Sequence, residues 1–563
     1  MKTVSKSPSG AASPIETMTS PKNQHSVHKK TNEKTKVSNL SASLPRTTAD
    51  LVDWARDNYG NKTFIVDGET HVSFNDLAKN VHALACSLVD HGFADGDRAA
   101  IWAPNCAQWI VAALAIQYVG GTLVTVNTRY KPSEARDILE DSGSAIVFAV
   151  DAFLDTEYAG ALKAMHIDGV RHIVSIRAPG TDRPDDFSRW LAGGEGATRD
   201  IRLQCDAMRA KLSPEHVSDI LFTSGTTGRA KGVVTTHGQN LRAFDTFSSI
   251  LGIDEQDRYL IINPFFHSFG YKAGWLAALL RGATVYPMAV FSVPEVLATV
   301  KTHAITVMPG PPTLFQSILM HPDLDPSDIS SLKKATTGAA TIPTQLIVDM
   351  RTILGIDTVI TAYGLSETCG LVTMCRAGDA PDVIAKTSGR AIPGVEVGIM
   401  DIDGALLPSE EPGEIVVRGF NVMSHYFNNA EATAEAIDAD GWLHTGDIGV
   451  LDHDGNIRIT DRLKDMFISG GFNCYPAEIE NQLLQHAAVA QVAIVGMPDP
   501  RMGEVCAAFV VIKAGETVSE SDLISWCKGT MANFKVPRKI IFASELPLNA
   551  SGKVLKTQLR TML

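Results

Sequence analysis

The sequence predicts an α/β fold that consists of a large N-terminal domain and a smaller C-terminal domain. Its 563 residues are too many for one compact core. From about residue 49 onward helical segments alternate with short apolar strands, and after residue 387 short strands and turns take over. Apolar residues make up 45% of the chain and charged residues 20%, which is ordinary for a globular protein that buries large cores.

The first alternating unit begins with a helix predicted within residues 73–92, SFNDLAKNVHALACSLVDHG. Ser73 can cap this helix, Asp76 stands three residues later, and a glycine ends the segment. A strand in DRAAIWAP, a helix over 106–118 and a strand in TLVTVN follow. This alternation predicts a mostly parallel sheet with helices on both faces.

The same pattern returns over residues 271–309. The segment WLAALLRGATVYPM precedes a second helix, and a further strand is expected in AITVMPG. The most apolar stretch, residues 109–126, is broken by Gln117 and a Gly-Gly pair. We therefore expect a buried helix followed by a strand there and no transmembrane segment. Peripheral contact with a membrane and oligomerisation both remain open.

Over residues 387–460 the sequence pattern changes to that of short strands and turns. The pair Asp454-Gly455 lies between two alternating strands and predicts a tight hairpin. A small β-barrel subdomain is expected here, which completes a large domain over 47–463. The chain then restarts with a helix at Pro476 and continues with two strands and another helix, which predicts a small α+β domain over 464–563.

The first 46 residues differ in charge from the rest of the chain. They carry eight Lys or Arg and two Glu, whereas the whole chain has a net charge of −13. Rich in Ser, Thr, Pro and Lys, residues 1–46 have too little apolar surface to fold and are predicted to be a disordered basic leader, without the apolar segment of a secretory signal. The negative net charge of the whole chain disfavours nucleic acid as a partner.

Eight cysteines are scattered along the sequence without any C-x-x-C pair. In a chain of this length the pattern predicts reduced thiols in the cytoplasm rather than a disulfide framework or a zinc site.

Residues 223–232, TSGTTGRAKG, combine four hydroxyl side chains, three glycines and a lysine. Such a stretch forms a natural anion cradle, although a surface turn with an incidental lysine is the plainer alternative. A Walker phosphate loop requires Gly before its Lys and Ser or Thr after it. Because Lys231 stands between Ala230 and Gly232, the cradle is not the Walker type.

The stretch TSGTTGRAKGV resembles the signature loop of the adenylate-forming (AMP-binding) superfamily, which includes acyl-CoA synthetases, luciferases and peptide-synthetase adenylation domains. The resemblance runs from about residue 50 to the end of the chain. Six further blocks follow in the family's order: PFFHSFG (264–270), TGAA (337–340), TAYGLSET (361–368), GWLHTGDIG (441–449), ITDRLKDMFISGGFNCYPAEIE (459–480) and PLNASGKVLK (547–556).

The resemblance implies an ATP-dependent acyl-CoA ligase that works in two steps. A carboxylic acid and ATP give acyl-AMP and pyrophosphate, and the acyl group then passes to CoA. The implied partners are therefore a small carboxylic acid, ATP, Mg²⁺ and CoA.

The resemblance also assigns nucleotide contacts. Glu367 would hold Mg²⁺ together with Thr223, and Thr368 would contact the α-phosphate. The residues expected around the β- and γ-phosphates are Thr223, Ser224, Gly225, Thr226, Thr227, Gly228 and Lys231. Those expected around adenine and ribose are Gly338, Ala339, Tyr363, Gly364, Asp447 and Arg462.

The remaining assignments concern the small domain and the acyl site. Lys553 would bridge the carboxylate and the α-phosphate, although a lysine on such a loop is otherwise a solvated residue. Lys464 matches the hinge of a mobile C-terminal domain, and Gly470 and Gly471 match the loop along the pantetheine tunnel. His267 would gate that tunnel, against the alternative of a satisfied core histidine. The residues expected to border the acyl site are Tyr271, Gly338 and Leu365.

Within the superfamily the sequence favours CoA ligases. Amino-acid-activating domains usually carry an Asp where this chain has His267, and no carrier module is expected after Leu563, whereas luciferases share every motif. The chain is most similar to the actinobacterial subfamily of steroid C/D-ring propanoate:CoA ligases and fatty-acid–CoA ligases. Medium- or long-chain fatty-acid ligation, acyl-AMP ligation and a non-catalytic nucleotide-binding role remain the alternatives, although the last predicts loss of Lys553, Glu367 or Asp447, and all three are present.

Overall fold

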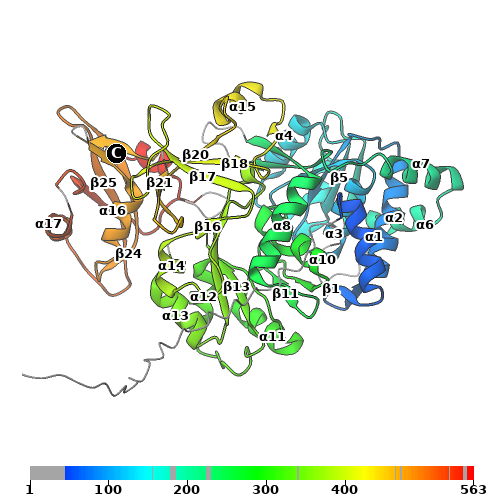
Figure 1. Cartoon of the computed structure of the whole chain (residues 1–563), viewed down its shortest axis with the longest axis horizontal. Coiled ribbons are helices and arrows are strands. Elements are labelled where there is room, and N and C mark those ends of the chain that lie inside the picture. The colour runs from blue at the N-terminus through cyan, green and yellow to red at the C-terminus, as the bar shows by residue number, and fades with distance from the viewer. Residues whose placement is uncertain are drawn as a thin grey trace, which may run out of the picture. The chain divides into compact units, whose positions relative to one another are not determined.

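The computed structural model describes residues 45–154, 156–177, 185–223, 230–338, 342–462, 465–469, 472–531, 533–548 and 554–563, and only the backbone at residues 462, 468, 472 and 473. The predicted basic leader therefore lies outside the described residues, apart from its last two positions. The described chain is a mixed α/β protein with a large N-terminal domain and a C-terminal domain, as predicted (Figure 1).

A seven-stranded sheet in the order β19-β10-β9-β4-β3-β5-β8 is the largest sheet of the N-terminal domain. Its five strands from β9 to β8 run parallel, whereas β10 and β19 are antiparallel to their neighbours. The mostly parallel sheet is thus confirmed. Its strands are β3 (Arg98–Trp102), β4 (Thr122–Thr125), β5 (Ile146–Val150), β8 (His172–Ile176), β9 (Val217–Thr223), β10 (Lys231–Thr236) and β19 (His425–Tyr426).

The helices of this region begin where the sequence indicates. Ser73 caps α2 and forms a capping box with Asp76, and α3 and β4 are almost entirely buried, in agreement with the interpretation of residues 109–126. The α-helices in the described part of this region are α1 (Thr48–Tyr59), α2 (Phe74–Asp90), α3 (Ala107–Tyr118), α4 (Pro132–Ser142), α5 (Tyr158–Lys163), α6 (Asp186–Glu195), α7 (Arg199–Arg209) and α8 (His237–Leu251). Two short strands, β6 (Ala152–Phe153) and β7 (Thr156–Glu157), pair with each other.

Two four-stranded sheets, β11-β12-β1-β2 and β13-β14-β15-β16, are joined through Val307, which bridges Tyr259 and Lys334 in parallel. The strand predicted in AITVMPG forms only in part: the segment has the single bridge at Val307, and the amides of Met308 and Gly310 donate to the carbonyls of Lys334 and Thr336. Pro309 follows closely and has no N–H to extend a ladder. The strands are β1 (Thr63–Asp67), β2 (Thr70–Ser73), β11 (Arg258–Ile261), β12 (Thr284–Pro287), β13 (Lys334–Thr337), β14 (Thr358–Tyr363), β15 (Thr373–Met374) and β16 (Arg390–Ala391).

Helices of this second region include a wide π-helical turn that the sequence pattern did not indicate. This turn, η2 (Tyr271–Leu276), directly precedes α10 (Ala277–Arg281). The remaining helices are α9 (Ser268–Gly270), α11 (Val293–His303), α12 (Pro312–Leu319), α13 (Thr344–Thr352), α14 (Pro381–Lys386) and the 3₁₀ turn η3 (Ser366–Thr368).

The expected β subdomain is an antiparallel sheet in the order β17-β18-β20-β21. Gly455 takes φ +78° in the tight turn between β20 and β21, where the hairpin was predicted. The two end strands of the described sheet are not paired with each other, so the sheet is open rather than a closed barrel. Its elements are β17 (Val395–Met400), β18 (Gly413–Gly419), β20 (Leu443–Leu451) and β21 (Ile457–Arg462), with α15 (Ala430–Ala436) between β19 and β20.

The C-terminal domain has hydrophobic cores of its own. One contains Ile479, Ile494 and Val510, and another contains Val495, Phe509 and Leu559. Pro476 begins α16, as predicted. The elements are β22 (Phe467–Ser469), β23 (Phe472–Cys474), α16 (Pro476–Leu483), β24 (Val489–Asp499), β25 (Gly503–Ile512), α17 (Glu520–Thr530), β26 (Lys539–Phe542) and α18 (Lys556–Thr561).

Candidate active site

The ends of the glycine-rich loop are held by a β-hairpin. Thr223, the last residue of β9, pairs across the hairpin with Lys231, the first residue of β10. The hydroxyl of Thr223 donates a hydrogen bond to the carbonyl of Lys231 at 3.3 Å. Residues 224–229 lie outside the described part of the chain, so the structure describes only the two ends of the loop.

Lys231 and Glu367 meet through a tyrosine from a third segment. The ammonium of Lys231 lies 4.9 Å from the ring centroid of Tyr426, a cation–π contact. The hydroxyl of Tyr426 donates to Oε1 of Glu367 at 2.8 Å. Burial, together with the charge of Glu367 and the hydrogen bond to it, raises the pKa of Tyr426, which therefore remains a donor at neutral pH. Residues from two distant motifs are thereby brought to one site.

Tyr426 was not predicted as a site residue because it belongs to none of the seven sequence blocks. It lies on β19, which adds to the edge of the seven-stranded sheet next to β10, with Tyr426 opposite Val233. The short strand has no alternating pattern of its own. Its signal is only a lone aromatic residue in NVMSHYF.

Glu367 stands on the 3₁₀ turn η3, whose geometry depends on two glycines. The Thr368 hydroxyl accepts from the Leu365 amide at 2.9 Å and donates to the Leu365 carbonyl at 3.0 Å. Both hydrogen bonds stabilise the turn in which Thr368 lies. Gly370 has φ +96°, and a Cβ there would lie 2.8 Å from the Cβ of Ser268. A Cβ on Gly364 would overlap the carbonyl group of Gly370.

Replacing Gly364 with alanine should therefore distort the turn that carries Glu367. We expect Gly364→Ala to lower the free energy of unfolding by about 1–3 kcal/mol, the usual cost of overpacking. Acyl-AMP formation per folded molecule should also fall. Urea unfolding and pyrophosphate exchange measure the two effects, and Gly529→Ala, whose Cβ would meet nothing within 4 Å, is the matched control. Equal behaviour of the two variants would contradict the packing role of Gly364.

Tyr363 and Asp447, expected to contact adenine and ribose, are hydrogen-bonded to each other. The Tyr363 hydroxyl donates to Oδ2 of Asp447 at 2.7 Å, and both side chains are buried. Asp447 also faces Arg462 across the β20–β21 pairing. Gly338 follows β13, next to β14, and a Cβ there would be 3.4 Å from the Ala362 carbonyl. The hydrogen bond between Tyr363 of β14 and Asp447 of β20 thus joins two sheets and brings together residues that were assigned to one nucleotide from separate motifs.

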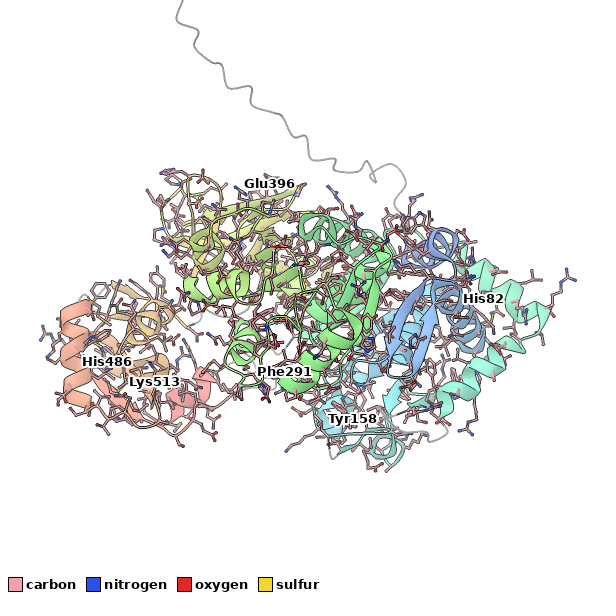
Figure 2. The ribbon with its side chains drawn as sticks, turned by 90° about the horizontal axis from the view of Figure 1, so that it is seen from below. His82, Tyr158, Phe291, Glu396, His486 and Lys513 are labelled. Atoms are coloured by element: carbon pink, nitrogen blue, oxygen red, sulfur yellow. The ribbon has the colours of Figure 1, made fainter. Side chains whose placement is uncertain are left out.

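Removal of the Tyr363 hydroxyl should weaken nucleotide binding. A hydrogen bond to a charged group contributes about 1.5–3 kcal/mol, so we expect Tyr363→Phe to raise the KM for ATP by about 10- to 100-fold. Pyrophosphate exchange at varied ATP measures this. Tyr158→Phe is the control, because the Tyr158 hydroxyl bonds to the Thr128 carbonyl instead (Figure 2 labels Tyr158). A KM unchanged in Tyr363→Phe would show that the bond does not orient Asp447 for ATP.

The segment that carries His267 is fixed by a buried amide. Asn105 is 4% exposed, and its Oδ1 accepts from the Phe265 amide at 2.8 Å. Its Nδ2 donates to the carbonyls of Ile261, Asn263 and Met288 at 3.0–3.2 Å. These hydrogen bonds fix the path of the chain towards His267, and no motif around Asn105 indicates them.

His267 itself is exposed and caps the short helix α9, accepting from the Phe269 amide through Nδ1 at 3.2 Å. The alternative of a buried core histidine is therefore wrong. The next residue, Ser268, packs against Gly370, so the segment of His267 lies beside the turn of Glu367.

Below the hairpin lies a buried ion pair between Asp219 of β9 and Lys272 of η2. Lys272 Nζ is 2.9 Å from Asp219 Oδ1, and both side chains are at most 1% exposed. The carboxylate also accepts from Ser218, Thr235 and Asn240 at 2.6–2.7 Å. This network ties the strand that leads to the glycine-rich loop to the helix that follows His267.

Tyr271, expected at the acyl site, is fully buried next to this network. Its hydroxyl accepts from Gln117 at 2.8 Å and donates to Asp219 at 3.4 Å. Its ring stacks on Trp275 with centroids 4.8 Å apart and lies 5.9 Å from Trp109. Tyr271 is thus part of a rigid aromatic cluster.

Several predicted residues lie outside the described part of the chain, so their positions stay predictions. They are Ala339, Lys464, Gly470, Gly471 and Lys553.

Comparison with known proteins defines the class. Residues 52–427 match the AMP-binding enzyme family, and residues 478–553 match the AMP-binding enzyme C-terminal domain. The chain therefore belongs to the AMP-binding enzyme family. It is an AMP-forming acyl-CoA ligase, which makes an acyl-AMP from a carboxylic acid and ATP and then forms the CoA thioester.

Two relatives are named as CoA ligases of a (7a-methyl-1,5-dioxo-octahydro-1H-inden-4-yl)propanoyl group. The one from Rhodococcus jostii is 48% identical over 92% of this chain and 98% of its own length. The one from Mycobacterium tuberculosis is 45% identical over 92% of this chain and 99% of its own length. The ATP-bound crystal structure of MatB from Rhodopseudomonas palustris matches with a TM-score of 0.81 and 27% identity, covering 91% of this chain and 98% of MatB.

No helix in the described ranges has both the length and the continuous apolar character that crossing a bilayer requires.

The eight cysteines are all free and buried.

Proposed function

We propose that this ligase activates a propanoate side chain carried by a fused-ring ketone and that the residues described above divide the adenylation step among them. The observation that carries the substrate is the shared name of two relatives, which are 48% and 45% identical to this chain over 92% of its length. Both names specify one bicyclic diketone with a propanoyl side chain.

The chemical problem is to bring two anions together. A carboxylate is a poor electrophile because its leaving group would be oxide, and transfer to the α-phosphorus of ATP gives it AMP as a leaving group instead. The site must cancel the repulsion between carboxylate and phosphates and stabilise the charge that develops at the α-phosphorus. In our proposal the loop over 223–231 holds the β- and γ-phosphates, which leave as pyrophosphate.

Lys231 and Glu367 suit this task. Lys231 is positioned by the ring of Tyr426, at the end of the loop where it can neutralise phosphate charge. Glu367 fits Mg²⁺, because one of its oxygens is held by the Tyr426 hydroxyl and the ion usually takes one or two carboxylates together with phosphates. The Thr223 hydroxyl is the second proposed ligand. When bound, Mg²⁺ would neutralise charge on the phosphates.

Asp447 is proposed to accept both ribose hydroxyls. Its carboxylate is held by Tyr363 at 2.7 Å, which leaves the group oriented before the nucleotide arrives. Arg462 stands opposite in the sheet, and Gly338 and Ala339 offer backbone to adenine, on which Tyr363 would stack.

The second step is proposed to use a different face of the small domain, residues 464–563. After acyl-AMP has formed, rotation about Lys464 withdraws Lys553 and brings Gly470 and Gly471 to the pantetheine tunnel, with His267 at its mouth. The exposed position of His267 supports the gate, since a buried side chain could not respond to CoA.

The aromatic cluster supports a compact ring system as substrate. If Tyr271 borders the acyl site, as the resemblance implies, the site ends at a side chain that is fully buried and stacked on Trp275. A rigid wall suits a fused ring better than a long alkyl chain, which needs a deep channel.

The test is pyrophosphate exchange with a panel of acids, followed by mass spectrometry of the CoA esters. Bicyclic and polycyclic propanoates should support exchange and give CoA esters, whereas medium- and long-chain fatty acids should give much less. Preference for fatty acids would overturn the substrate proposal and leave the ligase assignment intact. Acyl-AMP without any CoA ester would instead indicate an acyl-AMP ligase.

A further inference from the structure

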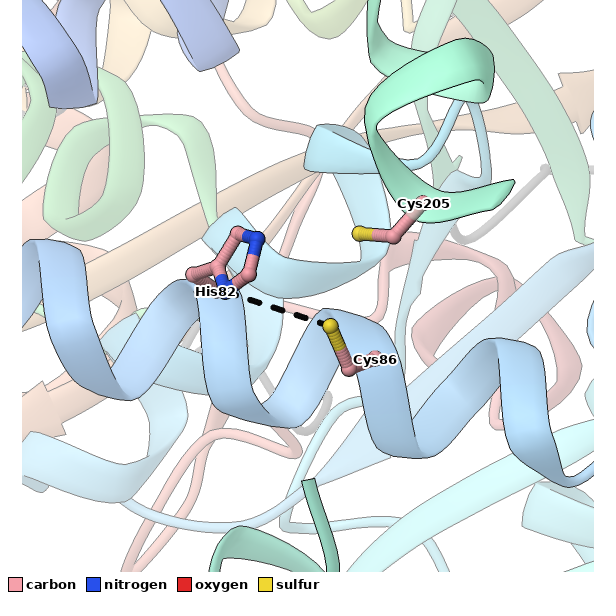
Figure 3. Close-up of side chains that lie close together, drawn as sticks. All are labelled: His82, Cys86 and Cys205. Carbon is pink, nitrogen blue, oxygen red and sulfur yellow. Dashed lines mark hydrogen bonds between the residues drawn. The ribbon is translucent and has the colours of Figure 1, made fainter. Parts of the chain in front are cut away.

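Three side chains of types that can bind a metal ion lie close together between two helices of the N-terminal domain, outside the proposed adenylation site. His82 and Cys86 are one turn apart on α2, and Cys205 faces them from α7 (Figure 3). One ligand atom from each, a ring nitrogen and two sulfurs, lies within 4.8 Å of the others. In the sequence the two cysteines are 119 positions apart, so their pairing could not be recognised from spacing.

We propose that His82, Cys86 and Cys205 form a binding site for Zn²⁺ or a similarly thiophilic divalent cation, which ties α7 to α2. Thiolate sulfur and imidazole nitrogen are the ligands that zinc prefers in proteins. Both cysteines are fully buried, whereas His82 is partly exposed. Binding would release one proton from each thiol, and two thiolates with one divalent cation leave the buried group without net charge.

The imidazole is oriented as a metal ligand should be. Its Nδ1 lies 3.9 Å from the Cys86 sulfur, on the side of the proposed ion. Its Nε2 lies 3.6 Å from Oδ1 of Asp206, the residue next to Cys205. A carboxylate on the far nitrogen is the common outer partner of a metal-bound histidine, because it fixes the tautomer and the ring orientation.

An entry path and a fourth ligand are available on the side of His82. A surface cavity of about 410 Å³ is lined by His82, Tyr118, Asp53 and Arg56, among others. The ring of His82 packs edge-on against Tyr118 at 6.0 Å. A water molecule from this cavity can complete a tetrahedral site, whereas the two sulfurs close the site on the protein side.

Helix α7 has few buried side chains that hold it against the rest of the domain. Of its eleven residues only Cys205 and Met208 are buried, so little apolar surface holds it. Seven residues separate the end of this helix from β9, the strand that leads into the glycine-rich loop. A cation between α2 and α7 would therefore stabilise the start of the segment that frames the nucleotide site without touching the nucleotide.

The experiment uses the full chain, reduced with a phosphine, stripped of metal and titrated with Zn²⁺ or Co²⁺. We expect one ion per chain and, with Co²⁺, the thiolate-to-metal absorption bands of a tetrahedral site. His82→Gln, Cys86→Ala and Cys205→Ala should lose these bands. Asp206→Asn should weaken binding by about 10- to 100-fold. Controls are His486→Gln and Cys527→Ala, in the C-terminal domain, which should bind normally (Figure 2 labels His82 and His486).

Two readouts keep the test decisive if a cysteine variant fails to fold. His82→Gln changes a partly exposed side chain and should fold, so its metal content alone can be compared with that of His486→Gln. Hydrogen exchange in α7 should slow when Zn²⁺ is added to the wild type and not when it is added to His82→Gln. Absence of thiolate–cobalt bands in the reduced wild type would overturn the proposal. So would equal binding by His82→Gln and His486→Gln, or a purified protein with a Cys86–Cys205 disulfide in place of the metal.

Discussion

Lys553→Ala is expected to slow acyl-AMP formation by about 10²–10³-fold, the usual effect of removing a donor that stabilises transition-state charge. In the proposed mechanism this lysine reaches both the carboxylate and the α-phosphate, so its loss acts on the step in which the two anions meet. Thioester formation from supplied acyl-AMP should be nearly unchanged, since the lysine has left the site by then. Pyrophosphate exchange and CoA-ester formation from synthetic acyl-AMP measure the two steps separately.

Lys513→Ala is the matched control, because Lys513 is an exposed lysine of the same domain and should affect neither step (Figure 2). An equal loss in both half-reactions of Lys553→Ala would argue for a structural role. Unimpaired adenylation would remove Lys553 from the mechanism.

Lys272→Met should cause the largest loss of stability. It leaves the carboxylate of Asp219 fully buried without its cation, and breaking a buried pair from one side costs about 3–5 kcal/mol. The double variant Lys272→Met/Asp219→Asn should recover most of this loss, because no unpaired charge then remains in the core. Urea unfolding of the single and double variants measures the coupling.

Lys301→Met is the control for the loss of an ion pair as such. Lys301 pairs with Asp328 at 2.8 Å on the surface, so its replacement should leave unfolding unchanged. If the double variant were no more stable than Lys272→Met, a buried uncompensated charge would not be the cause of the loss.

Much of the fold was predictable from local pattern. Ser73 and Asp76 mark the start of α2, Pro476 marks the start of α16, and Gly455 marks the β20–β21 hairpin. Each of these signals acts within a few residues and has a single physical cause, so it needs no knowledge of the rest of the chain. The strand expected in AITVMPG is reduced to one bridge that joins two sheets, and the local sequence does not reveal these partners.

The site was only partly predictable. The motifs give Glu367, Tyr363 and Asp447, but not the contacts that join them. Tyr426 and Asn105 act through single side chains that reach across the fold, and neither has neighbours in sequence that indicate a role. Cys205 likewise has no sequence neighbours that indicate a role. It comes close to Cys86 only because α7 packs against α2 in the folded chain.

The most direct test of the central claim follows the oxygen of the acid during one turnover. If the carboxylate attacks the α-phosphorus, an acid labelled with heavy oxygen should transfer one labelled oxygen to AMP when the CoA thioester forms. Mass spectrometry of the nucleotide and phosphate products gives the answer. We predict label in AMP and none in pyrophosphate; label in inorganic phosphate, with ADP as the nucleotide product, would contradict adenylation at this site.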